Sequence, residues 1–161
     1  MSGALELRQA VPSDAPAIRA LTREAYAKWV LLIGREPKPM TADYAEAVRK
    51  HRFDLLYVED RLAALIETIR EVDHLLVENV AVSPSFQGRG FGRRLMAHAE
   101  QLAASSGFRE IRLYTNKLFA ENVQLYERLG YRVDREEELK IGVAVHMSKP
   151  LRPTAPLGKR P

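Results

Sequence analysis

The order of helices and strands predicted along this chain of 161 residues indicates a mixed α/β fold, with one sheet and helices on its faces. Three observations carry this prediction. The chain opens with a strand pattern and two helical patterns, its middle holds three strand patterns in succession, and its second half alternates helices with strands. A chain of this length is about one domain, and it is large enough for a real hydrophobic core.

The first predicted elements are a short strand and a long helix. In the strand, Leu5–Arg8, apolar and polar residues alternate as they do in a half-buried strand. Ser13 or Asp14 then stands where a helix cap is expected, and Gly34 marks the end of the helix. Apolar residues recur at helical spacing between these points, namely Ile18, Leu21, Ala25, Trp29 and Leu32.

A second helix and three strands are predicted next. The helix is capped by Thr41 or Asp43 and ends near His51. The three strands are Asp54–Glu59, Leu62–Ile69 and Leu75–Val82. Because only Asp60 and Arg61 join the first two strands, we predict that they form a hairpin, although its turn lacks a glycine.

A helix with one apolar face follows three glycines, at positions 88, 90 and 92. Its apolar residues are Leu95, Met96, Ala99, Leu102 and Ala103, and Ser105–Gly107 ends it. Four further elements complete the prediction: a strand at Ile111–Tyr114, a helix at Asn122–Leu129, and strands at Tyr131–Val133 and Ile141–Met147. The charged run Asp134–Lys140 is predicted to be the turn between the last two strands.

The formal net charge of +4 raises the question of a nucleic-acid partner. Residues 149–161 hold four basic and no acidic side chains, so the rest of the chain is neutral. A surface that binds a phosphate backbone should lie on the folded body rather than in a loose tail. We therefore predict one folded domain over residues 1–148, a disordered Pro-rich basic tail over residues 149–161, and no nucleic-acid partner.

The absence of cysteine excludes disulfides, thiol nucleophiles and thiolate metal sites, and it fits a reducing compartment. The longest apolar run, Trp29–Ile33, is far shorter than the roughly 20 residues of a membrane-spanning helix. The amino terminus lacks the basic start and apolar middle of a signal peptide. We therefore expect a cytoplasmic protein that binds no membrane and needs no metal.

The glycines after Leu75–Val82 lie between a strand and a helix, which is the arrangement of an anion site. Gly88, Gly90 and Gly92 do not fit the dinucleotide spacing G-x-G-x-x-G, because Arg93 and Leu95 occupy the positions that would need glycine. A nucleoside-triphosphate loop is excluded as well, because no Gly-Lys-Ser/Thr occurs.

The segment Gln87-x-x-Gly90-x-Gly92 resembles the acetyl-coenzyme A (acetyl-CoA) signature of the GCN5-related N-acetyltransferase (GNAT) family. Leu125–Tyr131 is similar to a second motif of that family, in which a tyrosine precedes a glycine by four residues. The order of elements also matches over about residues 4–148. The resemblance implies a mostly antiparallel central sheet with helices on both faces and acetyl-CoA as cosubstrate.

By this resemblance, the pyrophosphate of the coenzyme lies over the N–H groups at the start of the helix, and the pantetheine arm pairs with the preceding strand. The residues implied in coenzyme binding are Val80, Ala81, Val82, Gln87, Gly88, Arg89, Gly90, Phe91, Gly92, Arg93, Asn116 and Asn122. The two asparagines are included because Phe119 stands where many family members have asparagine. Arg93 and Arg94 could equally belong to a solvated helix face.

Two side chains are candidates for the chemistry. Tyr126 matches the general-acid tyrosine of the family by position, and its alternative role is that of a core tyrosine. Glu78 is the candidate base, because it is a carboxylate inside an apolar strand, and its alternative role is pairing with an arginine. His74 is a weaker rival for the base, and His146 is expected to be structural.

The resemblance implies acetyl transfer to a primary amine of a small molecule or a protein, by direct attack in a ternary complex. The acceptor site would include Tyr26 and Trp29, although a tryptophan at helical spacing is more often part of a core. Dimers are frequent in the family, so a homodimer is compatible with this prediction. The alternative is a non-catalytic module on the same fold that binds or senses acyl-CoA.

Overall fold

The computed structural model describes residues 3–154. Within this range, seven strands form one sheet in the order β1-β2-β3-β4-β5-β7-β6. The strands are β1 Leu5–Gln9, β2 Arg52–Val58, β3 Arg61–Arg70, β4 Leu75–Val82, β5 Glu110–Asn116, β6 Arg132–Leu139 and β7 Gly142–Pro150. β4 and β5 are parallel, whereas β1–β2, β2–β3, β5–β7 and β6–β7 are antiparallel. The prediction of a mixed, mostly antiparallel sheet is confirmed.

Six α-helices occur in the described residues: α1 Ala15–Tyr26, α2 Val30–Ile33, α3 Lys38–Thr41, α4 Tyr44–Lys50, α5 Phe91–Ser105 and α6 Ala120–Arg128. The predicted long first helix is interrupted, because Ala27–Trp29 is a turn of 3₁₀-helix. The tighter winding of that turn shifts the residues that follow around the helix axis. As a result Leu32, which was expected on the apolar stripe, is exposed.

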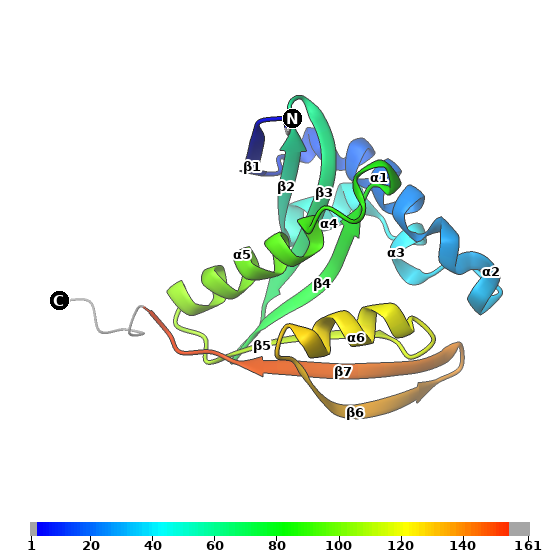
Figure 1. The fold of residues 1–161 in the computed structure, drawn as a ribbon, viewed down its shortest axis with the longest axis vertical. Helices are drawn as coiled ribbons and strands as arrows, with labels where there is room; N and C mark the ends of the chain where they lie inside the picture. Colours follow the sequence, from blue (N-terminus) through cyan, green and yellow to red (C-terminus); the bar gives the residue numbers. More distant parts are fainter. Residues whose placement is uncertain (1–2, 155–161) are drawn as a thin grey trace. The chain divides into compact units, whose positions relative to one another are not determined.

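The described chain folds into two compact units. The first unit contains the residues up to Thr68 together with Asn79–Met96, and the second contains Ile69–Glu78 and the residues from Ala97 onward. The boundaries fall inside β3, β4 and α5, so each of these elements contributes residues to both units. Figure 1 shows the elements of each unit along the chain.

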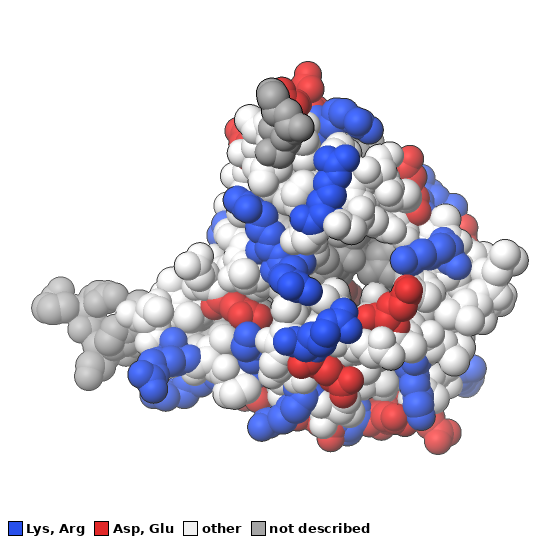
Figure 2. Space-filling model, in the orientation of Figure 1, with Lys and Arg blue, Asp and Glu red and all other residues white. Residues whose placement is uncertain are grey.

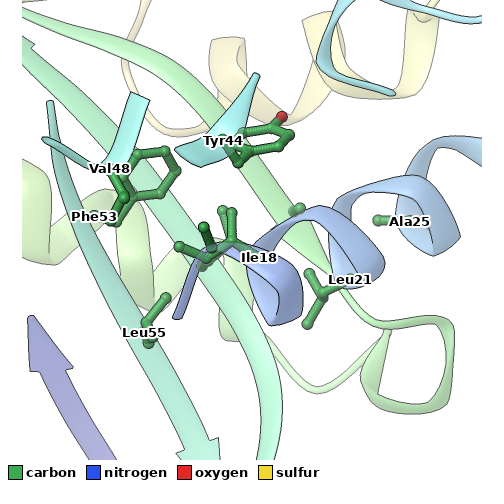
Figure 3. Packing of buried hydrophobic residues seen from close by; sticks show 10 residues of the cluster. Ile18, Leu21, Ala25, Tyr44, Val48, Phe53 and Leu55 are labelled. Carbon is green, nitrogen blue, oxygen red and sulfur yellow. The ribbon is translucent and has the colours of Figure 1, made fainter. Parts of the chain in front are cut away.

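The core of the first unit joins two helices to β2 (Figure 3). Its residues are Ile18, Leu21 and Ala25 from α1, Tyr44 and Val48 from α4, and Phe53 and Leu55 from β2. The rings of Tyr44 and Phe53 meet edge to face, with centroids 6.0 Å apart. Each large apolar side chain buried in this way contributes about 1.5–3 kcal/mol. The helical spacing that predicted α1 is therefore the spacing of its buried face.

The hairpin between β2 and β3 is confirmed, with a turn one residue earlier than predicted. Val58 pairs with Arg61, so Glu59 and Asp60 form the turn. Glu59 adopts a left-handed φ of 57° in place of the missing glycine. Its carboxylate accepts a hydrogen bond from the Ala4 N–H at 2.6 Å, which ties the turn to the start of the chain.

In the second unit, the charged run Asp134–Lys140 was predicted to be a turn, and this prediction was wrong. Most of the run belongs to β6, which pairs antiparallel with β7. β6 is the last strand of the sheet and its residues are largely exposed, so no apolar alternation marks it in the sequence. Where β6 and β7 lie, acidic and basic side chains are interspersed on the surface (Figure 2).

The ordered chain continues past residue 148. β7 extends to Pro150, the Leu151 N–H donates to the Arg109 carbonyl at 2.8 Å, and the Thr154 N–H donates to the Ala104 carbonyl at 3.1 Å. Residues 149–154, predicted to be part of the tail, are therefore tied to the fold by hydrogen bonds, and the rest of the predicted tail, residues 155–161, lies outside the described residues. Among residues 3–154, no helix has both the length and the apolar character needed to cross a membrane.

Candidate active site

β4 carries the candidate base on one face, as its alternating sequence predicts. Glu78, Val80 and Val82 are half-buried, whereas Asn79 and Ala81 are buried on the opposite face. Glu78 belongs to the second unit, and Asn79–Val82 belong to the first. The chemistry of each unit is therefore described separately.

The loop of the first unit that follows β4 is shaped by its glycines. Gly88 and Gly90 have left-handed φ angles of 82° and 80°, which residues with a side chain adopt only at a cost. A Cβ atom added at either position would meet nothing within 4 Å. The Gln87 side-chain amide donates to the Val82 carbonyl at 3.2 Å, which fixes the start of the loop against the end of β4. The backbone of this loop therefore faces open space.

The loop leads directly into the first turn of α5. Arg94 donates its N–H to the Gly90 carbonyl at 2.9 Å. The N–H groups that precede Arg94 at the helix start have no intrahelical acceptor, and the helix dipole adds partial positive charge there. A Cβ atom at Gly92 would lie 3.8 Å from Val82 Cγ2, which is an ordinary contact, so no neighbouring protein atom requires a glycine there.

The unpaired N–H groups and the partial positive charge at the start of α5 suit a phosphate group. The loop therefore fits the coenzyme that the motif implies.

Aromatic rings and arginines surround the loop. Phe91 is buried, and its ring centroid lies 6.2 Å from that of Phe86. Its side chain is thus part of the packing, and the predicted coenzyme contact of Phe91 is left to its backbone N–H. The Arg89 and Arg61 guanidinium groups lie 5.1 and 4.9 Å from the centroid of the Phe86 ring. Both separations are within the range of cation–π attraction. No sequence motif marks Arg61, and only the β2–β3 hairpin brings it to Phe86.

Tyr26 and Trp29, the predicted acceptor contacts, have different surroundings in the first unit. The Tyr26 hydroxyl donates to Asn79 Oδ1 at 2.7 Å, and Asn79 is buried in β4. Trp29 is half-buried, with the Lys28 ammonium 4.8 Å from its ring centroid. Tyr26 therefore holds β4 in place, and contact of either residue with an acceptor stays a prediction.

In the second unit, Glu78 is bound by a tyrosine. The Tyr114 hydroxyl lies 3.1 and 3.2 Å from the two carboxylate oxygens of Glu78. Tyr114 pairs across β5 and β7 with His146, and the ring centroids are 5.7 Å apart. The Nε2 atom of His146 lies 2.9 Å from a Glu137 oxygen. His146 thus packs against Tyr114, the residue that binds Glu78, which agrees with the structural role expected for it. The sequence did not single out Tyr114.

His74, the rival base, lies at the beginning of the same strand. Its Nδ1 atom is 2.8 Å from a carboxylate oxygen of Asp73. The hydrogen bond from His74 holds the pKa of Asp73 below its ordinary value. This pairing occupies one nitrogen of the His74 ring in a loop contact, which weakens its candidacy as the base.

Tyr126, the candidate acid, lies on α6 in the second unit. Its ring meets that of Tyr131 at 64° with centroids 6.0 Å apart, and burial raises the pKa of its hydroxyl to about 12. Within residues 3–154 this hydroxyl makes no hydrogen bond. The Tyr131 hydroxyl donates to one oxygen of Glu100 at 2.9 Å, and the Lys149 ammonium donates to the other at 3.0 Å. Tyr126 therefore packs on a fixed neighbour and keeps its own proton available.

The two candidate asparagines differ in what their side chains bind. Asn116 Oδ1 accepts the Leu118 N–H at 2.9 Å, so this oxygen organises the loop before α6. The Asn122 side chain is half-buried and makes no hydrogen bond in the described part of the chain. Phe119, at the position of the family asparagine, is buried and caps α6 with its carbonyl. Asn122 is therefore the asparagine whose whole amide remains available to a ligand.

Comparison with known proteins adds three kinds of similarity. Residues 16–131 match the model of the "Acetyltransferase (GNAT) family". The ribosomal-protein-S18-alanine N-acetyltransferase of Escherichia coli has a similar structure, with a TM-score of 0.77 and 21% identity over 98% of this chain and 99% of that one. The PaiA N-acetyltransferase of Thermoplasma acidophilum, solved with coenzyme A, also has a TM-score of 0.77, with 16% identity over 91% and 99% of the two chains.

Curated relatives match over shorter segments. The N-alpha-acetyltransferase 80 of Mus musculus is 39% identical over 71 residues, which are 44% of this chain and 21% of the relative. The [ribosomal protein bS18]-alanine N-acetyltransferase of Salmonella typhimurium is 36% identical over 47% of this chain and 51% of the relative. The matched segments thus span from about a fifth to about half of these two relatives.

Proposed function

Because the chain belongs to the acetyltransferase (GNAT) family, we propose that it transfers the acetyl group of acetyl-CoA to a primary amine of a small molecule or a protein. The observation that carries the proposal is the loop from Gln87 to Gly92. Its left-handed glycines open the backbone toward free space at the start of a long helix. This combination suits a pyrophosphate and has no evident structural purpose of its own.

The coenzyme contacts follow from this loop. The N–H groups at the start of α5 bind the pyrophosphate, and Arg89 and Arg93 add charge-assisted hydrogen bonds. The backbone along Val80–Val82, beyond the last residue of β4 that pairs with β5, pairs with the amides of the pantetheine arm, as an added strand would. In the second unit, Asn122 offers the coenzyme its uncommitted side-chain amide, and Asn116 offers its remaining N–H donors.

The reaction is a direct attack of the amine on the thioester carbonyl in a ternary complex. Glu78 accepts a proton from the ammonium group, which frees the nitrogen lone pair. The new C–N bond forms as the C–S bond breaks, and the leaving thiolate takes the proton of Tyr126. The second proton of the nitrogen leaves as the amide forms, and the Tyr126 oxygen takes up a proton in its place. Because burial raises the pKa of Tyr126 to about 12, this hydroxyl stays protonated at neutral pH and is able to serve as the acid.

The acceptor is an amine, and the names of the relatives suggest which amines to test first. Two relatives are an N-alpha-acetyltransferase and an enzyme for an alanine of a ribosomal protein, and a third, from Streptomyces lavendulae, is a streptothricin acetyltransferase. A panel should therefore contain peptides with a free amino terminus, a lysine peptide and small polyamine-like molecules.

The test is release of the coenzyme thiol on mixing the protein with acetyl-CoA and each member of this panel. We expect thiol release with at least one amine and an equal amount of acetylated product by mass spectrometry. If the protein bound acetyl-CoA tightly but released no thiol with any amine, the catalytic proposal would be rejected in favour of an acyl-CoA sensing module.

A further inference from the structure

We propose that Tyr114 is a positioning residue that acts on the reaction through Glu78. The proposal rests on the acetyl transfer proposed above and adds a residue to its machinery. The observation behind it is the contact of one hydroxyl with both carboxylate oxygens of Glu78, at 3.1 and 3.2 Å. A hydroxyl shared between two oxygens fixes the plane of the carboxylate as well as its position.

The register of the parallel strands explains why these two side chains meet. β4 and β5 pair at Leu75 with Ile111 and at Val77 with Leu113, and Val77–Leu113 is the last such pair. Glu78 and Tyr114 are the next residues along each strand, so they leave the paired segment together and on the same face. The strand register thus brings the side chains of Glu78 and Tyr114 within reach of each other.

Tyr114 is itself held from its other side. His146 lies opposite it on β7, with the two rings tilted by 32° and their centroids 5.7 Å apart. His146 is in turn bound to Glu137 on β6 at 2.9 Å. The ring of Tyr114 therefore packs against His146, and its hydroxyl binds Glu78. These two contacts restrict the movement of the Tyr114 side chain.

The hydrogen bond has a consequence for the base. A general base must lie within reach of the proton that it accepts and must be oriented toward it. Tyr114 is therefore expected to keep the Glu78 carboxylate in one position and orientation.

The first test is Tyr114→Phe, which keeps the ring against His146 and removes only the hydroxyl. We expect kcat to fall about tenfold, the size of one hydrogen bond to a charged group, while KM for acetyl-CoA changes less than about twofold.

A matched control removes a similar hydroxyl elsewhere. Tyr57 on β2 accepts a hydrogen bond from the Arg8 guanidinium at 2.9 Å and belongs to the first unit, whereas the proposed base belongs to the second. Tyr57→Phe should leave both kcat and KM for acetyl-CoA as in the wild type. If Tyr114→Phe behaved like this control, the positioning role would be refuted while the acetyltransferase proposal stood.

The decisive test combines Tyr114→Phe with Glu78→Gln. If Tyr114 acts through Glu78, the double variant should be no slower than Glu78→Gln alone, because the residue that transmits the effect is already lost. A further tenfold loss in the double variant would show that Tyr114 acts independently and would overturn the inference. If the wild type acetylated no amine, the proposed function would fail instead, and the inference would fall with it.

Discussion

The two units supply different kinds of chemistry, and they differ in how the sequence encodes them. The first unit offers mainly backbone: a glycine loop, the start of α5 and the Val80–Val82 segment of β4. The second offers side chains, with Glu78 bound to Tyr114 and Tyr126 packed on Tyr131. Backbone sites demand particular residues at fixed spacing, so they leave motifs. Side-chain sites depend on the register between strands, and this register produces no recognisable motif in the sequence.

This comparison predicts two separable sets of variants. Changes in the glycine loop of the first unit should alter coenzyme affinity and leave the chemical step intact. Changes to Glu78, Tyr114 or Tyr126 of the second unit should lower kcat and leave coenzyme affinity intact.

The largest effect is expected for Glu78→Gln. Removing a general base typically costs a hundredfold to ten-thousandfold, and we expect a loss in kcat of about a thousandfold. The dissociation constant for coenzyme A, measured by calorimetry, should change less than about twofold, because the amide keeps the shape of the side chain. A variant with near wild-type kcat would remove Glu78 from the mechanism.

Tyr126→Phe should have the next largest effect. The phenyl ring preserves packing against Tyr131 and removes the proton donor, so we expect kcat to fall about a hundredfold. A more acidic thiol leaves without being protonated by an acid. A thioester substrate with such a leaving thiol should therefore recover part of the rate that Tyr126→Phe loses. Unchanged turnover with acetyl-CoA would assign Tyr126 to the core alone.

Gly90→Ala tests the first unit. At a φ of 80° a side chain costs about 1–2 kcal/mol, and relaxing this strain should move the N–H groups that bind phosphate. We expect coenzyme A to bind about tenfold more weakly, with kcat at saturating acetyl-CoA unchanged. Gly34→Ala is the control, because Gly34 has a φ of 74° and equally open space but ends α2. Equal losses in the two variants would argue against a phosphate site.

The smallest effect on turnover is expected for Glu100→Gln, which acts on stability. Glu100 accepts hydrogen bonds from Tyr131 and Lys149, so its loss should lower the free energy of unfolding by about 1–3 kcal/mol. Glu46→Gln, which removes an exposed ion pair with Arg49 and Lys50 on α4, should lower the free energy of unfolding far less, because solvent screens that pair. Chemical denaturation measures both, and equal losses would contradict a structural role for the Glu100 cluster.

The sequence predicted the elements that rest on local patterns. β4 has the predicted bounds, and the glycine loop leads into α5 as expected. β6 was missed because an exposed edge strand needs no apolar alternation. The interruption after α1 was missed because helical spacing continues through Trp29 even though the backbone tightens there.

For the site, the sequence singled out Glu78 because a carboxylate stands out in an apolar strand. It did not single out Tyr114, which is one more aromatic residue in a strand. Only the pairing of Val77 with Leu113 brings Tyr114 to Glu78, and a register of this kind is not written in either strand alone.

The central claim is that the loop binds acetyl-CoA and Glu78 enables its reaction with an amine. The most direct test measures coenzyme A binding and formation of acetylated amine in parallel for the wild type, Glu78→Gln and Gly90→Ala. We predict that the wild type forms product, that Glu78→Gln binds the coenzyme normally but forms product about a thousandfold more slowly, and that Gly90→Ala binds weakly but turns over at saturation. A wild type that binds the coenzyme and acetylates no amine, or a Glu78→Gln variant with full activity, would contradict the account.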